Sequence, residues 1–91
     1  MGERFRLRGE GLEWRGVEGE IVALDLPADR YLGLNRSGAV LWQALVQGAS
    51  AAELADRLVG EFEIDRSQAE RDVRQFIAVL QAQGVLEPIE E

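Results

Sequence analysis

The spacing of apolar residues changes along the chain, from alternation in the first third to intervals of three and four residues in the remainder. The alternation extends from Phe5 to Trp14 with one glycine-containing break, and it returns over residues 21–26. A Glu-Gly pair at 18–19 separates the two stretches, and glycine is a common turn residue between paired strands. This pattern predicts short antiparallel strands joined as a hairpin.

A third strand is predicted over residues 30–34, after a Leu-Pro-Ala-Asp turn. Alternation puts Leu32 and Leu34 on the face that packs inward and leaves Tyr31 and Gly33 on the other face. A strand that passes directly into a helix is expected at a sheet edge, where unpaired backbone groups can bind another strand. Gly33 supports that interpretation, since a strand glycine often marks close approach by a second backbone.

Three helical segments follow, and the first, over the apolar residues 39–46, is predicted to be short and buried. The predicted N-terminal caps are Asn35, Ser50 and Asp65, and the predicted ends are Gly48, Gly60 and Gly84. Ser50 and Glu53 also have the spacing of a capping box, in which two orphan backbone donors are satisfied reciprocally.

Three strands followed by three helices with short connections predict an α+β fold with winged helix-turn-helix-like packing. The 91 residues have room for one domain. We expect this domain to span residues 1–91, with the sheet over about 4–34 and the helices over about 35–86.

The composition argues against an enzyme. The chain contains no Cys and no His, which removes thiolate nucleophiles, the usual zinc ligands and the side chain that most often transfers protons near neutral pH. The carboxylates are scattered through the helical surface pattern, and helix capping accounts for the serines. We therefore expect no catalytic residues, no metal site and no cofactor.

The charge and hydropathy of the chain bear on its location and partners. The chain starts without an apolar signal segment, and no apolar run approaches the roughly 20 residues of a membrane span. The expected location is therefore cytoplasmic, with no membrane as partner. The net charge of −7 disfavours contact with the phosphate backbone of nucleic acids.

A winged-helix DNA-binding regulator is the alternative function, because the same strands and helices build one. The arginines of the third helix are Arg66, Arg71 and Arg74. Asp65, Glu70 and Asp72 interleave with them, whereas a helix that reads DNA concentrates positive charge. The sequence therefore favours a function without nucleic acid.

Two stretches of the sequence together resemble the PqqD-like family. The first, Tyr-Leu-Gly-Leu-Asn-Arg-Ser-Gly-Ala-Val-Leu-Trp at 31–42, has a strand ending in Leu-Asn before an apolar helix that contains Trp. The second, residues 72–86, has Asp-Val, a spaced aromatic residue and Leu, and a closing Gly. The resemblance extends over residues 22–86 and rests on the ordered series with its spacings, because no single piece is specific.

The resemblance implies a RiPP recognition element, a non-catalytic domain that binds the leader segment of a ribosomally synthesised precursor peptide. In such domains the leader adds antiparallel to the open edge of the third strand and lies in a groove beside the third helix. A stand-alone member implies delivery of the peptide to separate enzymes. In a lasso peptide cluster, the setting we favour, the partner is a cysteine leader peptidase of transglutaminase-like type. In other clusters it is a radical SAM enzyme.

The peptide-binding residues predicted on this basis belong to the third strand and to one flank of the third helix. They are Arg30, Tyr31, Leu32, Gly33, Leu34, Ala69, Asp72, Val73, Phe76 and Val79. Val79 lies beyond Phe76 on the helical wheel and widens the apolar stripe past the width that packing on one neighbour requires.

Several of these residues also fit other roles. Asp72 suits a solvated helix face as well as a binding site. Tyr31 is either an exposed aromatic residue or a cover for a leader side chain, and Trp14 suits the core or a second interface with an enzyme. An open strand edge also permits pairing between two copies, so the sequence leaves a dimer open.

Overall fold

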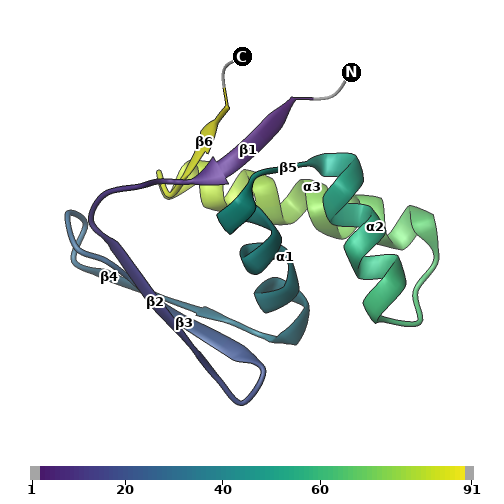
Figure 1. Ribbon diagram of the computed structural model, residues 1–91, viewed down its shortest axis with the longest axis horizontal. Coiled ribbons are helices and arrows are strands. Elements are labelled where there is room, and N and C mark those ends of the chain that lie inside the picture. The colour runs from purple at the N-terminus through teal and green to yellow at the C-terminus, as the bar shows by residue number, and fades with distance from the viewer. Residues whose placement is uncertain (1–2, 90–91) are drawn as a thin grey trace.

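A computed structural model describes residues 3–89 of the chain, which form strands and helices of short to medium length (Figure 1). In chain order the elements are β1 (Arg4–Leu7), β2 (Leu12–Val17), β3 (Glu20–Asp25), β4 (Arg30–Leu34), α1 (Arg36–Gln47), β5 (Ala49–Ser50), α2 (Ala51–Glu61), α3 (Arg66–Ala82) and β6 (Leu86–Pro88). The predicted α+β fold, with a three-stranded antiparallel sheet followed by three helices, is confirmed.

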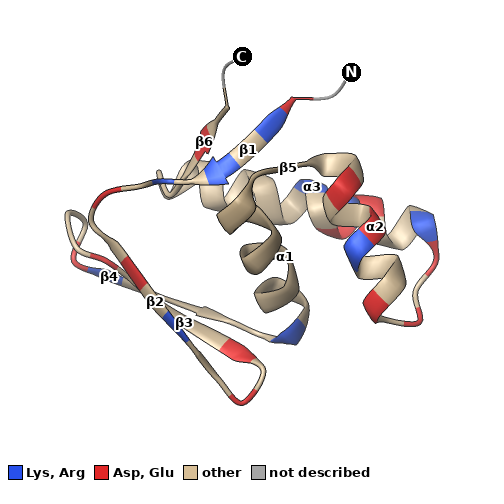
Figure 2. Ribbon diagram, in the orientation of Figure 1, with Lys and Arg blue, Asp and Glu red and all other residues tan. Residues whose placement is uncertain are grey.

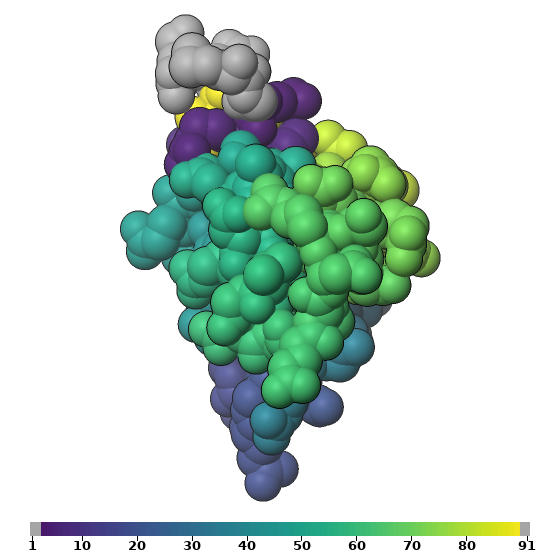
Figure 3. Space-filling view, turned by 90° about the vertical axis from the view of Figure 1, so that its right-hand side faces the viewer, coloured from purple at the N-terminus to yellow at the C-terminus, as the bar shows by residue number. Residues whose placement is uncertain are grey.

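The main sheet has the strand order β2-β3-β4, with both neighbouring pairs antiparallel. Glu18 and Gly19 join β2 to β3 with φ values of 53° and 83°. Two consecutive positive φ values are those of a type I′ turn, whose twist matches that of the flanking strands. Seen from the helical side, the tip of this hairpin projects beyond the helices (Figure 3).

A second small sheet, with the order β5-β1-β6, was not expected from the sequence. The prediction that residues 5–14 belong to one strand of the hairpin is wrong. The chain turns at Gly11, where φ is 71°, and Arg8 N donates to Val85 O over 2.8 Å. β1 therefore leaves the main sheet and pairs with the far end of the chain, bringing Arg6 opposite Glu87.

The predicted helix starts are confirmed by hydrogen bonds of their caps. Asn35 Oδ1 accepts from Gly38 N over 2.9 Å, and Asp65 Oδ1 accepts from Gln68 N over 2.8 Å. Ser50 and Glu53 form both bonds of the capping box, at 3.2 and 2.9 Å. These contacts are local, which is why sequence spacing predicts them.

The predicted end of the second helix at Gly60 is wrong. α2 continues through Glu61 and is capped by Phe62, whose N–H donates to Leu58 O over 2.9 Å. A Cβ at Gly60 would have no neighbour within 4 Å, and its φ is not positive, so the residue remains in the helix. The chain turns only at Phe62, whose ring packs against the core.

The core lies between the inner face of the main sheet and the helices. α1 contacts β3 and β4 on one side and α2 on another, and α2 packs on α3 (Figure 1). The largest fully buried side chains include Trp42, Ile21 and Leu45. The ring of Trp14 meets that of Trp42 edge-to-face with centroids 6.3 Å apart, although Trp14 stays 40% exposed. Trp14 thus contributes to the core on one side only.

The helices are short or charged rather than long and apolar. Within residues 3–89 none has the length and hydropathy needed to cross a bilayer.

Candidate functional site

The strand β4 forms one edge of the main sheet. It pairs with β3 along one side, and no described strand pairs with its other side. The sequence prediction that residues 30–34 form an edge strand is therefore confirmed. Its free side offers backbone N–H and C=O groups to an added strand.

The register of the sheet determines which backbone groups are free. The two-residue turn is closed by Val17 and Glu20, and a pair that closes such a turn exchanges backbone hydrogen bonds. Bonded and non-bonded pairs then alternate along an antiparallel ladder. Alternate residues of β3 from Glu20 onward therefore bond to β2. The residues of β3 whose backbone groups turn toward β4 are Ile21, Ala23 and Asp25.

The same alternation continues onto β4. The partners of those three residues are Leu34, Leu32 and Arg30. Their backbone groups are therefore used by β3, and the groups of Tyr31 and Gly33 point out of the sheet. The free edge consists of two N–H and two C=O groups, at Tyr31 and Gly33.

A groove of about 580 Å³ lies between β4, the start of α1 and one flank of α3. Its lining residues are Leu32, Gly33, Leu34, Asn35, Ser37, Gly38, Leu41, Leu58, Asp72, Gln75, Phe76, Val79, Leu80 and Gln83. Leu41, Leu58 and Leu80 are buried and form an apolar floor. Val79, 46% exposed, and Phe76, half-buried, leave apolar surface on the α3 side.

The direction of α3 along the groove follows from the contacts of Arg8. Its guanidinium donates to Asp25 Oδ1 over 2.6 Å and to Gly84 O over 2.9 Å. Asp25 is paired with Arg30, so the beginning of β4 lies beside the end of α3. β4 and α3 therefore run in opposite directions along the groove.

Six of the predicted peptide-binding residues line this groove. They are Leu32, Gly33, Leu34, Asp72, Phe76 and Val79. Ala69 and Val73 are 0% and 1% exposed, so they support α3 from the core and offer no surface to a peptide. Arg30 is exposed outside the groove, and Tyr31 lies on the opposite face of the sheet.

The start of α1 contributes residues that were not predicted for the site. Asn35, Ser37 and Gly38 line the groove next to the end of β4. The Leu-Asn-x-Ser-Gly order at residues 34–38 could have predicted their place in the site. A residue that caps a helix directly after an edge strand necessarily lies at the end of that edge. Asn35 Oδ1 already accepts from Ser37 Oγ over 3.0 Å, so this end of the groove is polar and internally bonded.

The polar groups along α3 differ in how they are satisfied. Asp72 Oδ1 accepts from Gln68 Nε2 over 2.8 Å and remains exposed. Gln83 Oε1, at the other end of the groove, is buried and has no hydrogen-bond partner among the described residues. The groove is thus acidic at one end, apolar in the middle and amide-lined at the other.

The arginines of α3 do not form a basic surface. Arg66 pairs with Asp56 and with Glu70, the latter over 3.1 Å, and Arg71 donates to Gln68 Oε1 over 2.8 Å. Basic and acidic positions interleave along α2 and α3 (Figure 2). This arrangement is unlike the concentrated positive charge of a helix that reads DNA.

Within residues 3–89 no group of three acidic, His or Cys side chains is placed to hold a metal ion.

Comparisons with known proteins agree with this geometry. Residues 20–86 match the family described as coenzyme PQQ synthesis protein D (PqqD). No curated protein matches the chain. Among solved structures, TbiB1 in complex with the TbiA(beta) leader peptide is 28% identical, with a TM-score of 0.82 over 94% of this chain and 99% of that one. Lasso peptide synthetase B1 complexed with the leader peptide is 33% identical, with a TM-score of 0.79 over 92% of this chain and 98% of that one.

Proposed function

This chain belongs to the PqqD family, and from that membership we propose that it is a non-catalytic protein that captures the leader of a ribosomally synthesised precursor peptide. The leader binds as a strand added to β4 and is delivered to processing enzymes. The observation that carries this proposal is the free edge of β4, which runs beside an apolar groove.

In this mechanism the backbone of the leader supplies the affinity. Tyr31 and Gly33 each exchange an N–H and a C=O bond with the leader, which runs antiparallel to β4. Because β4 and α3 run in opposite directions, the leader is parallel to α3. Its N-terminal part lies beside Leu34 and Asp72, and its C-terminal part leaves the groove beside Arg30 and the end of α3.

The side chains of the leader supply the selectivity. Residues of an added strand point alternately to the two faces of the sheet. Leader residues opposite Leu34 and Leu32 point into the groove, where apolar side chains contact Phe76 and Val79. A segment of roughly five to eight residues is long enough to cover β4 and the groove.

The similar structures support this proposal. Both are complexes with leader peptides, and both match this chain over more than nine-tenths of its length. For this chain we propose a leader peptidase as the enzyme partner, of the transglutaminase-like cysteine type, and the cytoplasm as the place where they meet. A different modifying enzyme would receive a leader held in the same groove, since this protein contributes only binding of the leader.

A fluorescence-anisotropy titration tests the proposed function. The probe is a fluorescein-labelled synthetic leader of the precursor peptide encoded nearest to the gene, and a labelled DNA duplex is the control. We expect saturable peptide binding and no DNA binding at physiological salt. Salt-sensitive DNA binding without peptide binding would overturn the proposal.

A further inference from the structure

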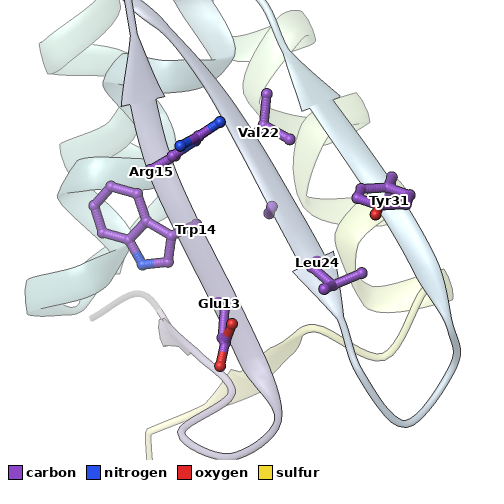
Figure 4. A pocket seen from close by; sticks show the side chains of 7 residues that line it. Glu13, Trp14, Arg15, Val22, Leu24 and Tyr31 are labelled. Carbon is purple, nitrogen blue, oxygen red and sulfur yellow. The ribbon is translucent and has the colours of Figure 1, made fainter.

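The outer face of the main sheet, opposite the helices, contains two rows of neighbouring side chains (Figure 4). One row runs across the strands from Glu13 through Leu24 to Tyr31. The other runs from Arg15 through Val22 to Gly33. The first row ends in an aromatic side chain at the free edge, and the second ends in a glycine.

Gly33 leaves a gap in the outer face at the free edge. A Cβ built on Gly33 would have no neighbour within 4 Å, and its φ is not positive, so neither crowding nor backbone conformation requires glycine here. Val22 and Tyr31 border this gap and are 43% and 74% exposed. Apolar surface thus lies next to an empty position on a strand whose outer edge pairs with no described strand.

Apolar side chains on this part of the outer face gather toward the free edge. A shallow depression of about 270 Å³ has Val22, Leu24 and Tyr31 on the β3 and β4 side. The charged Glu13 and Arg15 border it on β2, the strand farthest from the edge (Figure 4). A ligand that arrives along β4 therefore meets the apolar part of this face first.

A strand added to β4 extends both rows by one residue. The leader residue paired with Gly33 points to the outer face, because the leader residues on either side of it point into the groove. Its Cα lies two strand spacings, about 10 Å, from that of Val22. Since Gly33 has no side chain, a large side chain on that leader residue can lie across the glycine and contact Val22.

We propose that the protein reads the leader on both faces of the sheet, and that the outward residue opposite Gly33 is a large apolar or aromatic one. That residue packs in the gap over Gly33, against Val22 and beside Tyr31. This inference rests on the proposed function and adds a second specificity position to it, between the two groove positions. Cross-strand contacts of this kind account for an affinity about fivefold higher with a large apolar residue at this leader position than with alanine.

The test compares labelled leader peptides that differ at one position. An alanine scan of the leader with the wild-type protein first locates the two groove positions, two residues apart, at which alanine weakens binding. The residue between them is then Phe, Leu, Ala or Asp. We expect wild-type protein to bind the Phe and Leu peptides about fivefold tighter than the Ala peptide, and the Asp peptide weakest.

Two variants identify the surface responsible for that preference. Val22→Thr keeps the β-branched shape and should reduce the preference for Phe over Ala to about twofold. Val17→Thr is the matched control, because Val17 is 42% exposed on the same face at the far strand, and it should bind as wild type. Gly33→Thr fills the gap and should abolish the preference for Phe over Ala.

The outcomes separate this inference from the proposed function. Equal affinity for all four peptides, with the groove positions still sensitive to alanine, would overturn the outward specificity position and leave leader binding intact. An undiminished preference in Gly33→Thr would also overturn it. Absence of binding by any peptide to wild-type protein would overturn both.

Discussion

The guanidinium of Arg8 lies 2.6 Å from Oδ1 of Asp25 and joins three parts of the fold. Asp25 is 1% exposed at the end of β3, and Arg8 also donates to the carbonyl oxygens of Glu10 and Gly84. The ion pair therefore ties the β1–β2 connection and the main sheet to the end of α3. Two of these elements, the main sheet and the end of α3, contribute residues to the groove.

Replacing Arg8 by Met should lower the melting temperature by on the order of 10 °C, because the carboxylate of Asp25 would stay buried without a cationic partner. Arg6→Met, two residues earlier in β1, is the matched control. Its partner Glu87 is exposed, so we expect a decrease of only about 3 °C or less. Equal melting temperatures for the two variants in a thermal scan would contradict the role assigned to Arg8.

The stability of the protein should decline at acidic pH partly through Asp25. The hydrogen bond from Arg8 is the main reason why the pKa of Asp25 lies below its ordinary value, and a bond from the backbone of Ala28 adds to it. A carboxyl whose pKa is lower in the folded state stabilises the fold above its unfolded pKa, about 4. This contribution disappears as the pH falls through the folded pKa.

Urea denaturation midpoints should therefore change little between about pH 8 and pH 5 and fall below about pH 4. In Asp25→Asn the neutral-pH midpoint should be lower and the acidic decline shallower than in wild type. Parallel pH profiles for the two proteins would show that Asp25 does not contribute to the decline.

Gly33→Pro should abolish leader binding, because proline has no N–H to donate from the free edge. Its fold should persist, since the register assigns the backbone groups of Gly33 to the free side of β4. Gly33→Ala is the control, since a Cβ has open space at this position and the N–H remains. Anisotropy titrations, with circular dichroism to confirm folding, test both variants. Full affinity in a folded Gly33→Pro protein would place the peptide elsewhere.

Val79→Asp should weaken leader binding by about tenfold or more, because it places a carboxylate in the apolar middle of the groove. Val46→Asp is the matched control. Both valines are 46% exposed and lie near the C-terminal end of a helix, so the cost to helix stability is similar. Isothermal titration calorimetry should find wild-type affinity for Val46→Asp. Equal losses of leader affinity in the two variants would mean that the α3 flank does not contact the leader.

The elements that the sequence predicted correctly depend on interactions between near neighbours in the chain. Asn35, Ser50 and Asp65 each cap a helix through a bond that spans three residues. Alternation likewise predicted that Leu32 is buried and Tyr31 is exposed, because the two-residue period of a strand is a property of the backbone.

The groove was only partly predictable, since its lining depends on how α3 is rotated against its neighbours. Periodicity put Ala69, Val73, Phe76 and Val79 on a common apolar stripe. Packing on α2 and β6 buries the first two and leaves the second pair on the flank toward β4. A helical wheel shows the width of a stripe and does not show where the neighbouring element stops covering it.

By itself the sequence determined that three helices follow an antiparallel sheet, which residues cap their starts, and that β4 lies at the sheet edge, because local backbone preferences and side-chain periodicity decide those features. Only the tertiary structure decided that β1 pairs with β6, a contact that brings Arg6 opposite Glu87. The tertiary structure also decided that Arg8 joins Asp25 of the main sheet to Gly84 at the end of α3. Such contacts join segments far apart in the chain, and many alternative pairings satisfy the same local patterns until the whole core is packed.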